Sequence, residues 1–249
     1  MPQAVEHGAA VLVVDDRYVI ESRSGPVILT EHMKVDVHEL IRDRNICVVT
    51  VRDTRKALSA LSAAFFDHPA ERMKMIGITG TNGKTTTTTL LGEIMKAYQD
   101  DVFVVGNIGN PYTVAADLMT EHSIAVAEMS SFQLESIVSF RPNVSAILNY
   151  TPDHLNRHHT MEAYIAAKEN IARNQTEDDY CVLNYEEPVM RKFAETLKCH
   201  VLFFSSQHKL EKGIYLDNDK IIYKNPDEVE VCHVDELQIL GTHNYENVM

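Results

Sequence analysis

Short apolar runs alternate with amphipathic segments along most of the chain. Aliphatic and β-branched residues fill runs that are typical of buried strands, at 75–79, 102–105, 124–127, 144–148, 181–183 and 201–204. Apolar residues spaced three and four apart predict helices at 84–98 and 161–173. Because alternating strands and helices are typical of doubly wound domains, we predict an α/β fold whose mostly parallel sheet is flanked by helices. Two further runs joined through Asn218 and Asp219 predict a hairpin, 214–216 and 221–223.

The first part of the chain carries a weaker version of this pattern. Residues 3–8 predict the end of a helix that leads into a buried strand at 9–14, and the β-branched run 45–51 predicts another strand. Pro69 and the charged stretch 70–74 predict a linker. The pattern therefore divides the chain into a small partial α/β domain and a larger α/β domain, 1–70 and 71–249.

Composition places the protein among soluble globular proteins and narrows its partners. The chain has 249 residues, of which 45% are hydrophobic and 24% charged, and a formal net charge of −13. This balance argues against nucleic acid or an anionic membrane as the main partner. The N-terminus lacks the basic and apolar regions of a signal peptide, and the four widely spaced cysteines suit reduced thiols. We therefore expect a cytoplasmic protein, and we expect it to be a monomer.

A glycine-rich segment, Gly80-Thr81-Asn82-Gly83-Lys84-Thr85-Thr86, lies between a predicted strand and a predicted helix. In that context glycines allow backbone N–H groups to surround phosphate oxygens, and the start of the helix adds partial positive charge. The lysine can bridge phosphates and the first threonine can join a Mg²⁺ shell. The strict phosphate-loop spacing would require glycine where the chain has Ile78, one residue after Gly77. A glycine-rich turn with a chance lysine is the alternative, and the order strand, loop and helix favours phosphate binding.

Three other polar residues give only weak evidence of a site when the sequence is considered alone. Glu128 ends a predicted strand, where α/β proteins place ligand sites, although such a residue is often only a solvated carboxylate. Asn107 lies in a turn after another strand. Lys168 lies on an amphipathic helix, where a lysine commonly extends its charge to solvent. We also expect His158 and His159 to be exposed loop residues.

Four segments together resemble the Mur ligase family. They are the loop from Gly77 to Thr85, whose form the related folylpolyglutamate synthases share, and three further stretches: Glu128-Met129-Ser130-Ser131-Phe132-Gln133-Leu134-Glu135, Asn149-Tyr150-Thr151-Pro152-Asp153-His154, and Gly241-Thr242-His243-Asn244-Tyr245-Glu246-Asn247. The resemblance covers nearly the whole chain. It implies an ATP-dependent, ADP-forming ligase of peptidoglycan precursor synthesis, in which Asp153 belongs to the nucleotide and magnesium region.

The resemblance also implies roles for individual residues. ATP is expected at Gly80, Thr81, Asn82, Gly83, Lys84, Thr85, Thr86, Asn244 and Asn247. Mg²⁺ is expected at Thr85, Glu128, His154 and Lys168, the last as a carbamate. The UDP-linked substrate is expected at Asn107, Ser130, Gln133 and His154. The catalytic set is Lys84, Glu128, His154 and Lys168. Carbamylation requires a neutral amine, which burial favours by lowering the pKa of a lysine.

The resemblance is divided between two branches of the family. From about residue 84 the chain resembles the MurD branch, which adds D-glutamate to UDP-N-acetylmuramoyl-L-alanine, although Asn156 stands where that branch often has aspartate. Residues 1–75 resemble the MurE branch, which adds a diamino acid to the UDP-linked dipeptide. Phe132 opposes the MurE assignment, because that branch usually has histidine there.

D-Glutamate addition through an acyl phosphate is therefore the expected reaction. Diamino-acid addition and an ATP-binding module without ligase turnover remain alternatives. We expect the chain to lack the third domain of these enzymes, as a natural fusion, a designed hybrid or a truncated product.

Overall fold

A computed structural model describes residues 2–16, 19–22, 25–30, 33–36, 46–239 and 241–249. The chain forms two compact units, residues 1–64 and 65–249. The sequence-based boundary near residue 70 falls inside the second unit, where residues 69–71 form a short 3₁₀ helix and Met73 is buried. None of the helices in these ranges is long and apolar enough to cross a membrane.

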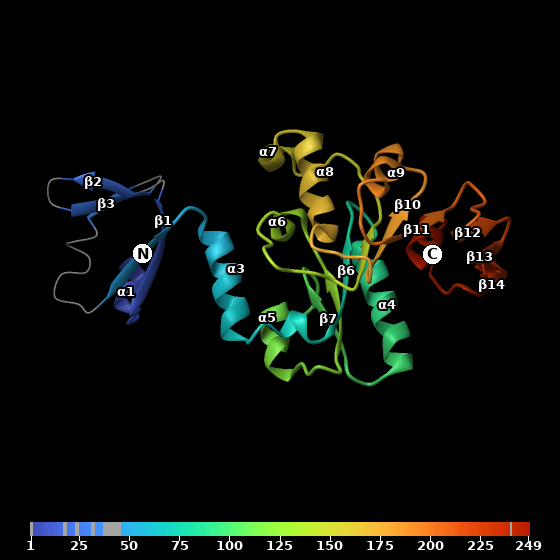
Figure 1. Cartoon of the computed structure of the whole chain (residues 1–249), viewed down its shortest axis with the longest axis horizontal. Coiled ribbons are helices and arrows are strands. Elements are labelled where there is room, and N and C mark those ends of the chain that lie inside the picture. Colours follow the sequence, from blue (N-terminus) through green and yellow to red (C-terminus); the bar gives the residue numbers. More distant parts are fainter. Residues whose placement is uncertain (1, 17–18, 23–24, 31–32, 37–45, 240) are drawn as a thin grey trace. The chain divides into compact units, whose positions relative to one another are not determined.

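The first unit contains two small sheets in its described residues (Figure 1). One is a parallel pair and the other an antiparallel, three-stranded sheet that the hydrophobic pattern did not predict. Asp53 begins the helix α3, because its carboxylate accepts hydrogen bonds from the N–H groups of Arg55 and Lys56. The elements are α1 Pro2–Glu6, β1 Val11–Asp15, β2 Val19–Ser22, β3 Gly25–Thr30, β4 Met33–Asp36, β5 Cys47–Val51 and α3 Thr54–Phe65.

The second unit is built on a nine-stranded sheet, counted over its described residues, with the order β14-β13-β12-β11-β10-β9-β6-β8-β7. The pairs from β7 to β12 are parallel, and β13 and β14 are added antiparallel. The strands are β6 Lys74–Thr79, β7 Val102–Gly106, β8 Ile124–Glu128, β9 Val144–Ile147, β10 Tyr180–Asn184, β11 His200–Ser205, β12 Gly213–Asp217, β13 Lys220–Lys224 and β14 Glu228–His233.

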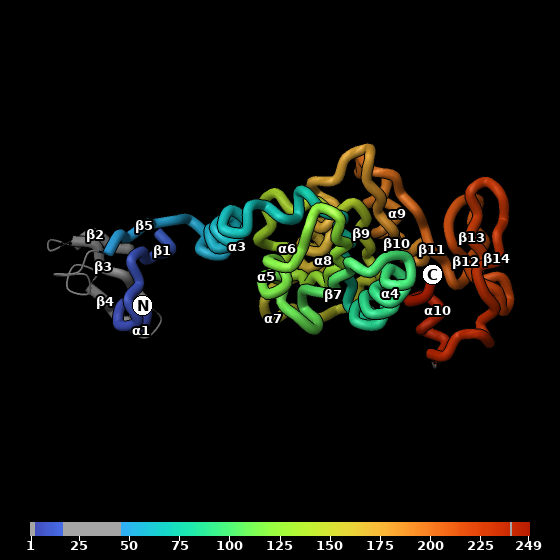
Figure 2. Tube along the Cα trace, turned by 90° about the horizontal axis from the view of Figure 1, so that it is seen from below, coloured from blue at the N-terminus to red at the C-terminus, as the bar shows by residue number. Residues whose placement is uncertain are grey.

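Helices cover both faces of this sheet (Figures 1 and 2). The helix α4 packs on one face, and α5, α6, α8 and α9 pack on the other. The α-helices are α4 Lys84–Tyr98, α5 Tyr112–Ala115, α6 Ser131–Leu134, α7 Leu155–His158, α8 Met161–Glu169, α9 Pro188–Ala194 and α10 His243–Val248. The 3₁₀ helices are η2 Pro69–Glu71, η3 Ala116–Leu118, η4 Asn170–Ala172 and η5 Val234–Glu236.

The core follows from the alternation of side chains along each strand. Ile78 and Val126 face α4 and pack with Leu91, whereas Met75 and Ala127 face the opposite layer. Every residue of β8 is buried, as expected of a central parallel strand covered on both faces. The mostly parallel α/β fold predicted from the hydrophobic pattern is therefore confirmed.

Two elements differ from the sequence-based expectations for this unit. The helix expected at 161–173 is α-helical to Glu169 and continues as η4, whose tighter turn is common at the end of a helix. The strand β14 was not predicted, because its side chains are largely exposed and it carries alternating glutamates rather than an apolar run. The hairpin through Asn218 and Asp219 is confirmed.

Candidate active site

The carboxyl ends of the parallel strands form the edge on which the candidate residues gather. In the sheet, β6 lies between β8 and β9, so the connections that leave β6 and its neighbours diverge at this point. Such a topological switch point leaves a crevice in which α/β proteins bind ligands. The loop after β6, the end of β8 and the segment after β9 all lie at this edge.

The loop between β6 and α4 has a backbone suited to phosphate. Gly83 has a φ of 80°, a left-handed conformation that favours glycine, and a Cβ there would collide with the side-chain oxygen of Asn247. Lys84 begins α4, and its Nζ donates to the carbonyl oxygens of Gly80 and Thr81, each at 2.9 Å. The ammonium group therefore lies over the loop, where phosphate oxygens can replace these carbonyls as its partners.

Asn149, two residues after the end of β9, holds this loop in shape. Its Oδ1 accepts hydrogen bonds from the N–H groups of Thr81 at 3.0 Å and Asn82 at 2.8 Å, and its Nδ2 donates to the Asn82 carbonyl at 3.1 Å. Asn149 begins one of the segments that resemble the family, but its side chain was not among the predicted site residues. The available signal was its position at the carboxyl end of a strand beside β6.

Replacing Asn149 with alanine is expected to weaken ATP binding about 10-fold, because the loop loses three hydrogen bonds that fix its backbone. Isothermal titration calorimetry with ATP measures the change. Asn174→Ala is the matched control, since the Asn174 amide donates to the carbonyls of Val138 and Phe140. Equal losses of affinity in the two variants would contradict a specific role for Asn149.

Glu128 brings together three of the residues that the sequence singled out. This carboxylate is 2% exposed, and its two oxygens accept from the Thr85 hydroxyl at 2.9 Å and the Asn107 amide at 3.1 Å. Carboxylate and hydroxyl oxygens beside a phosphate loop suit Mg²⁺, which is commonly held by one or two carboxylates together with substrate phosphates. The described residues contain no cluster of three or more His, Cys, Asp or Glu side chains that could hold a metal ion alone. A metal here would therefore need phosphate oxygens as well.

Lys168 is buried against the phosphate loop rather than extended to solvent. Its Nζ donates to the Gly80 carbonyl at 2.5 Å and lies 4.7 Å from the centre of the Tyr164 ring. Burial, together with the nearby charge of Lys84, lowers the pKa of this amine to about 7 against the opposing effect of Asp153. A large fraction of the amine is therefore neutral, and nucleophilic, near neutral pH.

Two further groups of candidate residues lie at the starts of α6 and α7. His154 has a φ of 52° at the start of α7, with its Nε2 3.4 Å from Asp153 Oδ2 and its ring centre 4.9 Å from that of Phe132. Ser130 and Gln133 form a capping box at the start of α6, which engages both side chains with each other.

The expectation that His158 is exposed is wrong, whereas His159 is exposed as expected. The His158 side chain is 2% exposed, and it lies 3.2 Å from Glu135 and 2.9 Å from the Ser131 hydroxyl. Both partners belong to α6 or follow it directly. A lone histidine in a polar sequence gives no signal of this tertiary contact.

The helix α10 packs against the phosphate loop and the first turn of α4 through Asn247. Asn247 donates to Asn244 Oδ1 at 2.7 Å, and its own oxygens accept from the Thr87 hydroxyl at 3.4 Å. Asn244 is buried. The two asparagines expected near the nucleotide are therefore adjacent and lie against the start of α4.

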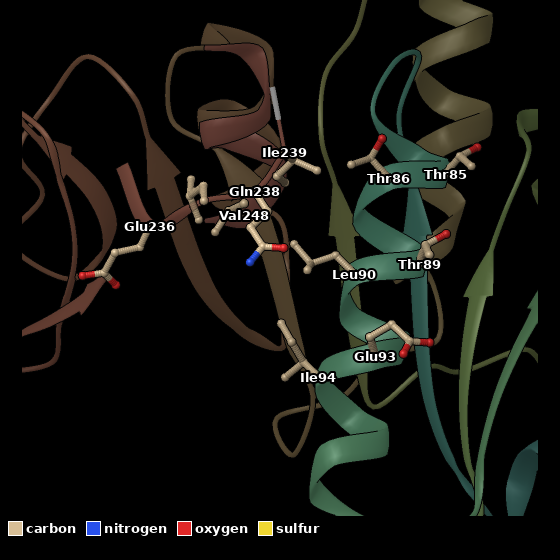
Figure 3. A pocket seen from close by; sticks show the side chains of 11 residues that line it. Thr85, Thr86, Thr89, Leu90, Glu93, Ile94, Glu236, Gln238, Ile239 and Val248 are labelled. Carbon is tan, nitrogen blue, oxygen red and sulfur yellow. The ribbon is translucent and has the colours of Figure 1, made fainter. Parts of the chain in front are cut away.

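A cavity of about 660 Å³ lies beside α4 and opens next to the phosphate loop. In Figure 3, Leu90 and Ile94 project from α4 toward the segment that carries Gln238 and Ile239. The walls are mostly apolar, and Thr85 and Thr86 at the start of α4 complete the lining together with Thr89, Glu93, Glu236, Leu237 and Val248. A flat, weakly polar group attached to a bound phosphate chain could enter this cavity.

Residues 78–249 match the family model described as the Mur ligase middle domain. The chain is 60% identical over 177 residues to the UDP-N-acetylmuramoylalanine–D-glutamate ligase of Lachnoclostridium phytofermentans, covering 71% of this chain and 39% of that protein. It is 53% identical over 174 residues to the enzyme of the same name from Clostridioides difficile, covering 70% and 39%. The chain thus spans about two-fifths of the length of the curated relatives that it matches.

Solved structures with the same fold are more distant in sequence. A UDP-N-acetylmuramoyl-L-alanyl-D-glutamate–2,6-diaminopimelate ligase superposes with a TM-score of 0.63 at 22% identity, covering 81% of this chain and 47% of that one. MurF from Acinetobacter baumannii superposes with a TM-score of 0.57 at 22% identity, covering 95% and 57%. These likenesses show the fold.

Proposed function

The chain belongs to the Mur ligase family, and from that premise we propose that it adds D-glutamate to UDP-N-acetylmuramoyl-L-alanine at the expense of ATP. The observation that carries the proposal is the convergence of Lys84, Lys168 and the Glu128–Thr85 pair on one phosphate loop. The names of relatives that are 44% to 60% identical support D-glutamate as the added amino acid. Since the precursors are nucleotide-linked and water-soluble, we place the reaction in the cytoplasm.

ATP would enter with its phosphates in the loop 80–83 and against the start of α4. Lys84 would transfer its hydrogen bonds from the Gly80 and Thr81 carbonyls to the phosphates, and the N–H groups of the first helical turn add favourable charge. The base would lie in the apolar cavity beside Leu90, and Asn247 lies against Gly83 of the phosphate loop. This placement is consistent with a cavity whose lining includes Thr85 and Thr86 at the start of α4.

Glu128 and Thr85 would hold Mg²⁺ together with the phosphates, and Asn107 keeps the Glu128 carboxylate oriented. A bound Mg²⁺ supplies electrostatic stabilisation to the transferring phosphoryl group. Ser130, Gln133 and His154, from the same edge of the sheet, would contact the UDP-linked substrate.

Lys168 would act as a carbamate. Its neutral amine can add to CO₂, forming a C–N bond and losing one proton, so that a neutral group becomes an anion with two oxygens. That anion would lie near Lys84, whose positive charge stabilises it just as it disfavours the protonated amine. The carbamate oxygens would then help Glu128 and Thr85 to hold Mg²⁺.

The reaction follows from these positions in two steps. An oxygen of the alanine carboxylate attacks the γ-phosphorus of ATP, the bond to the bridging oxygen breaks, and ADP leaves, giving an acyl phosphate. The amine of D-glutamate then attacks the activated carbonyl carbon, its proton is lost, and inorganic phosphate leaves. Lys84 offsets the charge that develops on the transferring group, which is the main task in phosphoryl transfer.

Phosphate release with matched substrate pairs tests the proposal. With ATP and UDP-N-acetylmuramoyl-L-alanine, release should require D-glutamate and should form the amide product. Release only with the UDP-linked dipeptide and a diamino acid would instead support MurE-type specificity. Tight ATP binding with no product from either pair would support a nucleotide-binding module without turnover.

A further inference from the structure

A chain of polar side chains, buried at Ser131 and His158, links α6 to α7. The Ser131 hydroxyl lies 2.9 Å from His158 Nε2, and His158 Nδ1 lies 3.2 Å from Glu135 Oε1. Glu135 also accepts from Arg157 Nη2 at 2.9 Å. Ser131 is 3% exposed and the His158 side chain 2% exposed, so these hydrogen bonds form in an environment that strengthens them.

An aromatic cluster covers this polar chain and reaches His154. The Phe132 ring stacks on His158, with a centroid distance of 5.4 Å and an interplanar angle of 14°. Arg157 lies 4.6 Å from the same ring, and the His154 ring lies 4.9 Å from it. Tyr164 of α8 closes the cluster at 5.2 Å from His158. The Phe132 ring therefore contacts both His154 and His158.

The order serine, histidine and carboxylate resembles a nucleophilic triad, but its placement excludes that use. The Ser131 hydroxyl is buried at the first position of α6, so no substrate carbonyl can approach it. The arrangement is better suited to stabilising the short helix α7. The helix α7 spans only Leu155–His158, and a single helical turn is not stable without tertiary contacts.

We propose that Ser131, His158 and Glu135 form a positioning unit that docks α7 on α6 and thereby fixes the imidazole of His154 at the substrate edge of the sheet. His158 is thus a positioning residue that acts through His154, and the catalytic consequence rests on the function proposed above. The left-handed backbone of His154 supports this reading, because a non-glycine residue keeps such a conformation only where its surroundings hold it.

Nuclear magnetic resonance of the ¹³C-histidine-labelled chain tests the positioning directly. The signal of His154, identified by its loss in His154→Gln, should carry a ring-current shift from Phe132. In Ser131→Ala, which removes one hydroxyl and keeps a good helix former, this shift should move toward that of a free histidine. His159→Gln, a change at an exposed neighbour, should leave it in place. An unchanged His154 signal in both Ser131→Ala and His158→Gln would overturn the proposal.

A double-mutant cycle on turnover tests the consequence separately. Ser131→Ala and His158→Gln should each lower kcat about 10-fold, a typical cost of losing a supporting hydrogen bond behind a site residue. In a His154→Gln background, Ser131→Ala should lower kcat no further, since its effect passes through His154. An additive second loss would overturn positioning through His154. A shifted His154 signal with no change in turnover would support the positioning and contradict the role given to His154 in the reaction.

Discussion

Replacing Lys84 with methionine is expected to weaken ATP binding at least about 100-fold. Methionine keeps much of the length of the side chain but removes the ammonium group that lies over the loop, 2.9 Å from the carbonyls of Gly80 and Thr81. Charge-assisted bonds to phosphate are among the strongest hydrogen bonds in proteins, and this lysine would make them to two phosphates. Titration calorimetry with ATP and Mg²⁺ measures the loss.

Lys96→Met provides the matched control for this variant. Lys96 lies on the same helix, exposed and paired with Glu93 at 2.7 Å, so its loss should leave ATP affinity within about twofold of the parent value. An affinity for ATP that survives Lys84→Met would contradict the assignment of loop 80–86 as the phosphate site.

Replacing Lys168 with methionine is expected to stabilise the fold near neutral pH and to abolish turnover. The pKa of Lys168 is about 7 in the folded chain, below the ordinary value of 10.5. The unfolded chain therefore binds the proton of this amine more tightly than the folded chain does. Burying this charge costs on the order of 5 kcal/mol once both states are protonated, below about pH 7. The cost falls as pH rises from about 7 to 10.5, where both states become neutral. Methionine carries no such cost.

Urea unfolding in CO₂-free buffer between pH 6.5 and about pH 10 measures this effect. The stability advantage of Lys168→Met over the parent should be largest at the acidic end and should shrink steadily as pH rises. Lys192→Met, a change at an exposed lysine of α9, should show no such trend. A difference between Lys168→Met and the parent that is independent of pH would contradict the buried, weakly basic amine.

The sequence predicted the strands that are buried on both faces of the sheet. The strands β6 to β11 are covered on both faces, so they appear as apolar runs, and the longer helices α4 and α8 were predicted from apolar residues spaced three and four apart. The strand β14 failed this test, because Val229 and Val231 are 55% and 52% exposed and alternate with glutamates. An apolar run identifies strands that are buried. It does not identify exposed strands, which are stabilised mainly by hydrogen bonds to the neighbouring strand.

The site was predictable where its residues follow directly from chain order. Lys84 and Glu128 stand at a helix start and a strand end, and the alternation of elements brings such positions to one edge of the sheet. Asn149 and His158 depend on contacts between distant segments, since Asn149 bonds to Thr81, 68 residues earlier. Lys168 could not be placed from its local sequence. An amphipathic helix favours a lysine that extends to solvent, whereas tertiary packing directs this side chain toward the Gly80 carbonyl.

The fate of oxygen in the alanine carboxylate tests the central claim most directly. UDP-N-acetylmuramoyl-L-alanine labelled with ¹⁸O in that carboxylate is incubated with ATP, Mg²⁺ and D-glutamate, and the released phosphate is examined by mass spectrometry. Attack of the carboxylate on the γ-phosphorus, followed by loss of phosphate from the carbonyl carbon, predicts that each phosphate carries one labelled oxygen. Amide product accompanied by unlabelled phosphate would contradict the acyl phosphate, and with it the assignment of the loop, Glu128 and Lys168 to its formation.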